Sequence, residues 1–259
     1  MAITFAVAVN DRTIFGNSLL ASPCFSGQHE HEILAQENFI SAATAFNDAI
    51  DRSANDVMVF AHQDVVFPSS WPAQLNQAME YLKIHDPDWG VLGCWGAAPD
   101  QPGVGYIYSN GLGLLGQAFE KPVEVQTLDE VVLILRKSSG LRFDERLPHF
   151  HFYGAALCLT AAHRGMKSYV IPALCIHNTQ FNLVLPREFY ASYKKLKQLW
   201  PSSLPIQTSC IRVTRYDIHK YKRQIREGYL KYIRRRTIGA TRVTDVNKLL
   251  GCLDLCRSS

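Results

Sequence analysis

The sequence lacks three features that assign many chains to a class at first sight. It has no apolar run close to the roughly 18 residues that cross a bilayer, which argues against a membrane-spanning protein. Its first apolar segment has no basic residues in front of it, so we expect a first strand there rather than a signal peptide. Its seven cysteines include no CxxC pair, and most lie in apolar stretches, which favours reduced, buried thiols in a cytosolic protein.

What the sequence does have is enough apolar material for a large core, and an uneven distribution of charge. The chain of 259 residues is 47% hydrophobic, and its net charge is only +4. Residues 211–236, however, hold ten lysines and arginines against two acids, a local charge of +8, so the rest of the chain carries −4. Apolar side chains recur in this segment mostly at three- and four-residue steps, at Ile218, Tyr221, Ile225, Tyr229, Tyr232 and Ile233. The pattern predicts an amphipathic, tyrosine-rich, cationic helix.

Three interpretations of this basic segment stay open. A solvated helix packed on its own domain, a helix on an anionic membrane surface and a nucleic-acid patch can all have such a composition. Tyrosine is favoured at lipid interfaces, which supports the membrane interpretation. Nucleic acid is the least favoured partner, because a nuclease-like metal centre elsewhere in the chain would need several clustered carboxylates.

Patterns typical of buried strands alternate with helical stripes through the rest of the chain. The expected strands are Ile3–Val9, Asp56–Ala61, Trp89–Gly96, Val131–Arg136 and Ser168–Ile176. The expected helices are Ser41–Asn55, a segment that begins at Pro72, and Ala155–Met166. This alternation predicts an α/β fold with a mainly parallel sheet covered by helices on both faces. The glycine-rich stretch 97–121 has no clear period and is expected to be an irregular loop or a lid over the acceptor side.

Polar residues follow three of the predicted strands directly. Asn10 and Asp11 come after the first strand, the triplet 62–64 (His-Gln-Asp) after the second, and His177 after the last. Ligands of open α/β sheets bind beyond the carboxyl ends of the strands, so these side chains are expected to converge there. Acid and imidazole at such an edge suit a metal held against a phosphorylated ligand. The alternative is that each strand end simply reaches the surface.

Several motifs occur together in an order that resembles a known family. Residues 45–50 read AFNDAI, residues 62–65 read HQDV, residues 140–145 read GLRFDE, Tyr153-Gly154 follows, and a closing strand ends at His177. This ordered set resembles the family 2 glycosyltransferases of the GT-A fold, in particular a bacterial branch with HQDV as its metal motif. The resemblance covers about residues 1–205, which leaves residues 206–259 as a basic, amphipathic, helical extension.

The resemblance implies a function and a set of donor-site residues. Such an enzyme moves a sugar from a nucleotide-sugar donor to a glycan or lipid-linked hydroxyl acceptor, usually with inversion, at the cytoplasmic face of a membrane. Asp64 and His177 are the implied ligands of a divalent metal, Mn²⁺ or Mg²⁺, that bridges to the donor diphosphate. The implied nucleotide-sugar-binding residues are Asn10, Asp11, Asn47, His62, Gln63 and Asp64.

One departure from the family pattern concerns the catalytic base. Inverting members usually place an acid after Tyr-Gly, but Ala155 and Ala156 occupy both candidate positions here. A positioned base contributes roughly 10²–10⁴ in rate, so a substitute is needed if the chain is active. The candidate substitutes are Asp129, Asp144, Glu145 and His151. Asp129 forms an acidic pair with Glu130 just before a strand, and it is favoured within the pair because members of the resembled family often have an acceptor-side Asp there. The alternative is a nucleotide-sugar-binding scaffold with little or no transfer activity.

Overall fold

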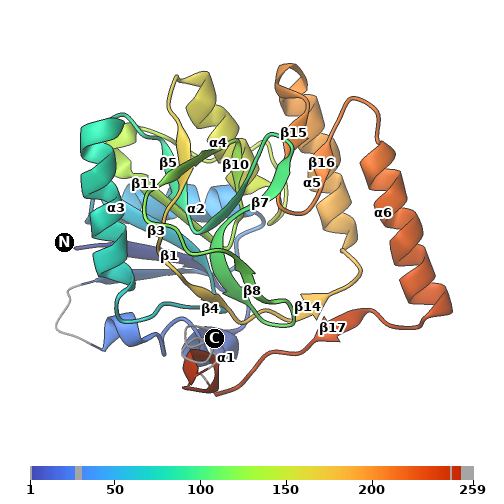
Figure 1. Cartoon of the computed structure of the whole chain (residues 1–259), viewed down its shortest axis with the longest axis horizontal. Coiled ribbons are helices and arrows are strands. Elements are labelled where there is room, and N and C mark those ends of the chain that lie inside the picture. The colour runs from blue at the N-terminus through green and yellow to red at the C-terminus, as the bar shows by residue number, and fades with distance from the viewer. Residues whose placement is uncertain (1, 27–30, 246, 252–259) are drawn as a thin grey trace.

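The computed structural model describes residues 2–26, 31–245 and 247–251 and has a seven-stranded sheet at its centre (Figure 1). Its strands, in spatial order, are β2 (Glu32–Gln36), β1 (Thr4–Ala8), β3 (Val57–His62), β11 (Val132–Arg136), β5 (Val91–Gly93), β12 (Ser168–Val170) and β9 (Val123–Val125). β1 pairs in parallel with both β2 and β3, and β12 pairs in parallel with β5. Only β11 and β9 run against the other strands of this sheet. The predicted mostly parallel α/β sheet is confirmed.

The structure also contains a second sheet, which has six strands. It contains β10 (Thr127–Leu128), β6 (Trp95–Ala98), β7 (Gln101–Ser109), β13 (Ile176–His177), β4 (Val65–Val66) and β8 (Gly113–Gly116). The expected irregular loop 97–121 is therefore wrong for most of its length, because β7 pairs with both β6 and β8. Its glycines obscured the strand pattern. A side chain at Gly116 would collide with the backbone of Gly105 across the β7–β8 pair, so glycine is needed there.

Two predicted strands each divide between the two sheets. The stretch 89–96 becomes β5 and β6, separated at Cys94. The stretch 168–176 ends its first strand at Val170, and β13 begins only at Ile176. Pro172 lies in the gap, where its lack of a backbone N–H prevents a continuous strand ladder. The consequence for the site is direct, because His177 reaches it from the second sheet.

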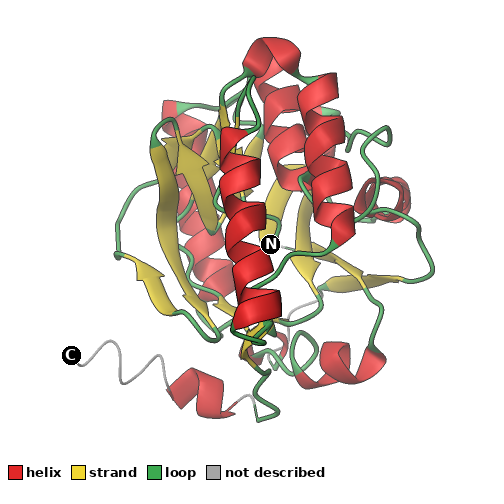
Figure 2. Ribbon diagram, turned by 90° about the vertical axis from the view of Figure 1, so that its right-hand side faces the viewer, coloured by secondary structure: helices red, strands yellow, loops and turns green. Residues whose placement is uncertain are grey.

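Helices cover both faces of the central sheet (Figure 2). The helices are α1 (Arg12–Asn17), α2 (Ala42–Arg52), α3 (Trp71–His85), α4 (Tyr153–His163), α5 (Arg187–Leu199) and α6 (Ile218–Gly228). Successive residues of β1 point to opposite faces, so Ala6 packs with α2 and α4 while Phe5 and Val7 pack with α3. Short 3₁₀ helices occupy Pro23–Phe25, Lys137–Ser139 and Pro201–Ser203, and a π-helical turn, Tyr229–Ile233, follows α6.

Helix α2 shows how the predicted pattern becomes a core element. Ser41 caps its N-terminus as predicted, and the side-chain oxygen accepts a hydrogen bond from Thr44 N at 3.3 Å. Phe46, which stands where the family pattern often has arginine, is fully buried. Its ring lies 5.1 Å from that of Phe60 and 5.5 Å from that of Tyr153, in edge-to-face contacts. An aromatic cluster therefore joins α2 to the strand that carries His62.

The last part of the chain begins inside the core and then leaves it. β15 (Ile206–Gln207) pairs with β16 (Arg212–Val213), and Ile206 and Val213 are fully buried in the main core. The chain then forms α6, which stands apart from the sheet, and returns along the lower edge through β17 (Ile238–Ala240) (Figure 1). β17 pairs with β14 (Phe181–Asn182). Among the described residues, no helix combines the length and apolar character that crossing a membrane requires.

Candidate functional site

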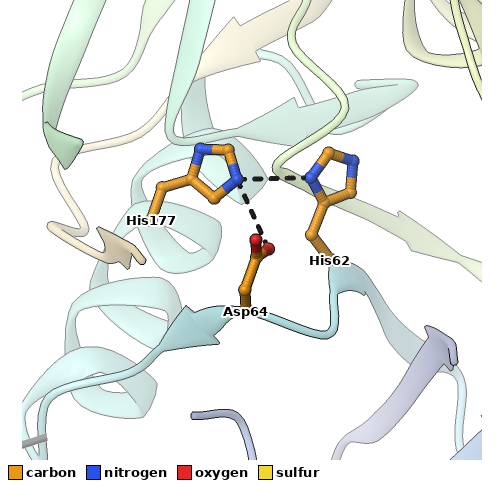
Figure 3. A group of neighbouring side chains, drawn as sticks. All are labelled: His62, Asp64 and His177. Carbon is orange, nitrogen blue, oxygen red and sulfur yellow. Dashed lines mark hydrogen bonds and ion pairs between the residues drawn. The ribbon is translucent and has the colours of Figure 1, made fainter. Parts of the chain in front are cut away.

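Three polar side chains from separate strand ends meet at one edge of the sheet (Figure 3). His62 ends β3, Asp64 lies in the turn between β3 and β4, and His177 ends β13. β13 pairs with β4, which places His177 opposite Val65, next to Asp64 in the chain. His177 Nε2 lies 3.4 Å from Asp64 Oδ1 and 3.5 Å from His62 Nδ1. The predicted convergence of these residues is therefore present.

The protonation states of the cluster suit a metal ligand set. Burial, and next the nearby His177, lower the pKa of His62 to about 4, so its imidazole is neutral at physiological pH. Burial opposes ionisation of Asp64, but His177, His62 and Arg242 outweigh it, and the pKa of Asp64 lies below its ordinary value. The site thus offers a neutral imidazole beside a carboxylate that stays ionised.

The spacing of the cluster also fits a single cation. His62, Asp64 and His177 each offer one ligand atom, and these atoms all lie within 4.8 Å of one another. Two imidazoles and one carboxylate suit Mn²⁺ better than Mg²⁺, which prefers oxygen ligands. A protein set of this size leaves coordination positions for phosphate oxygens and water.

Gln63 lies between His62 and Asp64 in the chain, but its side chain is hydrogen-bonded to Asn10 and Asp11. Its Oε1 accepts hydrogen bonds from Asn10 N at 3.0 Å and Asp11 N at 3.1 Å, and its Nε2 donates to Asn10 Oδ1 at 2.5 Å. Asp11 in turn caps α1, since its Oδ1 accepts from Thr13 N and Ile14 N. These bonds tie the end of β1 to the end of β3, which positions the edge from which His62 and Asp64 project.

A cleft of about 820 Å³ opens beside the cluster. Among the predicted site residues, those that line it are Asn10, His62, Gln63, Asp64, His151 and His177. The remaining predicted residues, Asp11, Asn47, Asp129, Asp144 and Glu145, are not among its lining. The structure therefore brings the metal-motif residues and one of the four candidate bases together in one cavity.

Asn47, Asp144 and Glu145 make contacts that hold one loop, away from the cleft lining. Asn47 Nδ2 donates to Phe143 O at 3.0 Å and to Glu145 Oε1 at 2.8 Å, and Asn47 Oδ1 accepts from Phe143 N at 3.0 Å. Asp144 accepts hydrogen bonds from the Arg146 side chain at 2.7 and 2.8 Å, and that side chain lowers the pKa of Asp144. These contacts account for the FDE motif structurally, because they fix the segment that leads to α4.

Of the other two candidate bases, His151 faces the cleft and Asp129 is held within the protein. Asp129 Oδ2 accepts a hydrogen bond from Ser209 Oγ, and Asp129 Oδ1 accepts one from Val131 N at 3.2 Å. Burial, and next the neighbouring His149, lower the pKa of His151 below its ordinary value of 6.5. His151 is therefore a neutral imidazole at physiological pH and is able to accept a proton.

Glu130 is the other member of the acidic pair in which the sequence favoured Asp129. Part of the residue reaches the surface, but its carboxyl group is enclosed at the N-terminus of α4, where the N–H groups of Phe152 and Gly154 donate towards it. Burial, and next the charge of Asp129, raise the pKa of Glu130 to about 8. The Tyr153 hydroxyl donates to the Glu130 carbonyl at 3.1 Å. Glu130 follows Asp129 directly in the sequence, but only the fold shows that it packs against α4.

Arg242 is a cleft residue that the sequence did not indicate. Its Nη2 and Nε lie 3.0 and 3.3 Å from Asp64 Oδ2, and its side chain lines the cleft. It comes from the C-terminal part of the chain, far beyond the motifs, and no local pattern marks it. Asp64 therefore has imidazole on one oxygen and guanidinium on the other.

Comparisons with known proteins agree with the architecture. A curated protein of Fuscovulum blasticum, "ATP synthase subunits region ORF 6", is 30% identical over 128 residues, which are 47% of this chain and 51% of that relative. The chain thus spans about half the length of the curated relative it matches. The crystal structure of S. aureus TarS is 13% identical, with a TM-score of 0.50 over 91% of this chain and 44% of that one.

The mannosyltransferase PcManGT from Pyrobaculum calidifontis, in complex with GDP-Man and Mn²⁺, is 11% identical, with a TM-score of 0.46 over 76% of this chain and 61% of that one. At such identities a structural likeness speaks for the fold alone. The family assignment comes from a sequence model, described as "Glycosyltransferase like family", which matches residues 4–197 and so includes all three residues of the cluster. Because that match covers well over half of the chain, this chain belongs to the glycosyltransferase-like family.

Proposed function

We propose that this protein transfers a sugar from a nucleotide-sugar donor to a hydroxyl acceptor, with a divalent cation held by His62, Asp64 and His177. The observation that carries the proposal is the meeting of these three side chains in a cleft, within a chain of the glycosyltransferase-like family. The likeness to the HQDV branch and the polar strand ends supports the same donor site. A glycan or lipid-linked acceptor and inversion at the anomeric carbon are part of this proposal.

The chain's own residues have separate tasks in such a reaction. A divalent cation at the cluster would supply charge neutralisation for the departing nucleoside diphosphate. Asp64 is held ionised by its neighbours, and His62 is held neutral by burial, so both keep a free lone pair at physiological pH. Asn10 and Gln63 brace the edge of the sheet and thereby fix where the cluster points into the cleft.

We further propose that His151 accepts the proton of the acceptor hydroxyl. Among the four residues predicted as substitutes for the usual acid, His151 is the one that lines the cleft. Its lowered pKa keeps it unprotonated at physiological pH, which a general base requires. Ala155 and Ala156, by contrast, are buried in the first turn of α4 and offer no titratable group.

A donor-release assay tests this function. Release of nucleoside diphosphate from UDP- and GDP-sugars with Mn²⁺ is measured for the wild type and for Asp64→Asn, with Asp88→Asn, an exposed acid on a loop, as the matched control. Asp64→Asn is expected to lower the rate by about 10²- to 10³-fold, and Asp88→Asn to leave it unchanged. Equal rates for wild type and Asp64→Asn would contradict the proposed site. Donor binding without release or transfer across the panel would instead support a nucleotide-sugar-binding scaffold.

The location of the enzyme is a separate part of the proposal. We propose that it works in the cytoplasm at the inner face of a membrane, attached through α6 and the π-helical turn. Ile225 and Ile233 are 74% and 69% exposed on this segment, and Tyr232 is 71% exposed. The cationic side chains Lys222 and Arg226 are exposed on the same helix. Apolar and aromatic side chains among exposed cations are what an anionic lipid surface binds.

Vesicle sedimentation tests the membrane contact. The full chain is mixed with neutral vesicles or with vesicles that contain anionic lipid, and the bound fraction is measured at low and high salt. The double variant Ile225→Ser, Ile233→Ser is expected to lose binding, whereas Ile84→Ser, an equally exposed position on α3, is expected to keep it. Absence of wild-type binding to anionic vesicles at low salt would rule the contact out.

A further inference from the structure

A segment of the C-terminal chain lies across the site end of the molecule, and we name residues 237–245 the strap. Its first contact with the rest of the protein, which we call the body, is made by β17, where Ala240 is opposite Phe181 in the β14–β17 pair. Leu183 N donates to Thr237 O at 2.8 Å at the start of this pairing. Asn110 Nδ2 then donates to Thr241 O at 2.6 Å. The strap is therefore bonded to the body just before Arg242.

The body also binds the strap just after Arg242. Asn178, which follows the cluster residue His177 in the chain, donates from Nδ2 to Val243 O at 2.7 Å and accepts from Val243 N through Oδ1 at 2.9 Å. Asn178 is buried, so this pair of bonds is shielded from solvent. Further along, Leu249 is buried against Ile176 in the core beside β13. Arg242 is thus held between two anchors, one of which is the neighbour of a cluster residue.

Gly111 of the body allows the strap to approach closely, because it has no side chain. Gly111 has a φ of +83°, and a side chain there would come within 2.6 Å of Ala240 Cβ. A residue other than glycine at this position would be strained and would push the strap away. The close approach confirms that the strap is fitted to this surface.

Arg242 points from the strap into the cleft towards Asp64. Its Nη2 contacts Asp64 Oδ2 at 3.0 Å, and Asp64 Oδ1 is left facing His177 at 3.4 Å. The Arg242 side chain is 31% exposed and lines the same cleft as the cluster. The guanidinium group of Arg242 therefore contacts the carboxylate of Asp64 and is also accessible from the cleft.

We propose that Arg242 binds the diphosphate of the donor and makes cation binding at the cluster depend on that diphosphate. The inference rests on the proposed function, and it names a residue of the donor site outside the matched family domain. A guanidinium presents two parallel N–H groups that match phosphate oxygens. A divalent cation alone on Asp64 would be repelled by Arg242 at close range, whereas a bound diphosphate supplies negative charge to both. Cation and diphosphate therefore bind together more favourably than either binds alone.

Isothermal titration of the full chain tests this proposal. Mn²⁺ alone, and then UDP, GDP, ADP, CDP and dTDP each with Mn²⁺, are titrated into the wild type, Arg242→Gln and Arg242→Lys. Arg226→Gln, an exposed cation on α6, is the matched control. Arg242→Gln is expected to raise the Kd of the best nucleoside diphosphate about 10- to 100-fold while Mn²⁺ alone binds at least as tightly as to the wild type. Arg242→Lys keeps the positive charge but lacks the two parallel N–H groups of guanidinium, so its Kd for the nucleoside diphosphate is expected to lie between those of the wild type and Arg242→Gln.

The outcomes separate this inference from the proposed function. Unchanged or tighter binding of the nucleoside diphosphate to Arg242→Gln would overturn the inference, and tighter binding would in addition identify the strap as a competitor of the donor. Weaker binding of Mn²⁺ alone to Arg242→Gln would also overturn it, because repulsion would then be absent. Failure of the wild type to bind any of these nucleoside diphosphates with Mn²⁺ would overturn both the proposed function and the role of Arg242.

Discussion

Helices α2 and α6 each have eleven residues and an amphipathic sequence, yet the protein uses them in opposite ways. Seven residues of α2 are buried, and its apolar stripe packs into the main core. In α6 the one buried residue is Glu227, while Ile218 and Ile225 are 55% and 74% exposed. An amphipathic pattern therefore predicts a helix correctly in both places, but it does not say which face turns towards the protein.

Helix α6 is held to α5 by polar contacts. Glu227 accepts a hydrogen bond from the Tyr190 hydroxyl at 2.7 Å and pairs within its own helix with Arg223 at 3.0 Å. At the start of the helix, Asp217 pairs with Lys197 of α5 at 2.6 Å and with Lys220 of α6 at 2.7 Å. The polar residues thus face α5 and the apolar residues face away. Helix α2 therefore turns its apolar face into the core, whereas α6 turns its apolar face to the solvent.

The largest expected effect compares a residue of the cleft with a residue of α6. His151→Ala is expected to lower the rate of sugar transfer by about 10²- to 10⁴-fold, because the variant lacks the proposed proton acceptor. His219→Ala, an exposed histidine on α6, is expected to leave the rate unchanged. Steady-state transfer rates of both variants give the comparison. A normal rate in His151→Ala would transfer the role of base to another residue.

The pH dependence of wild-type activity tests which residue is the base. A base must be unprotonated, and the pKa of His151 lies below 6.5, so activity is expected to rise with pH below that value and to stay level above it. Burial raises the pKa of Glu130 to about 8, so a rise centred near pH 8 would identify Glu130 as the base. Comparing the wild-type profile with that of Glu130→Gln assigns the titration to one residue.

The next largest effect concerns stability. Phe46→Ala is expected to lower the free energy of unfolding by about 3–5 kcal/mol, because it leaves a cavity among Phe60, Phe143 and Tyr153. Urea denaturation measures the change, and Phe46→Leu is expected to cost less because it fills more of the space. A loss below about 1 kcal/mol for Phe46→Ala would show that the cluster repacks around the gap.

The smallest expected effect lies on the other helix. Ile225→Ala removes an apolar side chain that is 74% exposed, so the free energy of unfolding is expected to change by less than about 0.5 kcal/mol. The same urea experiment measures it. A destabilisation comparable with that of Phe46→Ala would break the contrast between α2 and α6, because it would show that Ile225 packs against the body in solution.

The sequence predicted the parts of the site that depend on strand ends. His62, Asp64 and His177 each follow a recognisable apolar run. His62 and Asp64 lie at the end of β3 in the central sheet, whereas His177 joins them from the second sheet through the β13–β4 pair. Arg242 could not be found in this way, since its approach to Asp64 depends on the strap and its bonds to Asn178. Asn47 shows the opposite case. Its family motif was recognised, but its amide is occupied by the backbone of Phe143, a contact between residues that are distant in the sequence.

The irregular loop expected at residues 97–121 was wrong for a different physical reason. Pattern reading depends on side chains, and a side chain is excluded at Gly105 by the backbone oxygen of Cys94 and at Gly116 by that of Gly105. The Val131–Arg136 prediction was right as a strand, but its direction could not be read locally. β11 runs antiparallel to both neighbours, because the chain enters it from the second sheet through β10.

The pairing of Asn178 with the strap has a consequence for how this family is dissected. The family match ends at residue 197, whereas one oxygen of Asp64 is partnered by a residue from beyond it. The proposed donor site therefore depends on a residue outside the matched domain. A chimaera that places residues 4–197 of this chain in another scaffold would keep Asp64 but lose Arg242, and even a well-folded hybrid would carry a cleft with an altered charge.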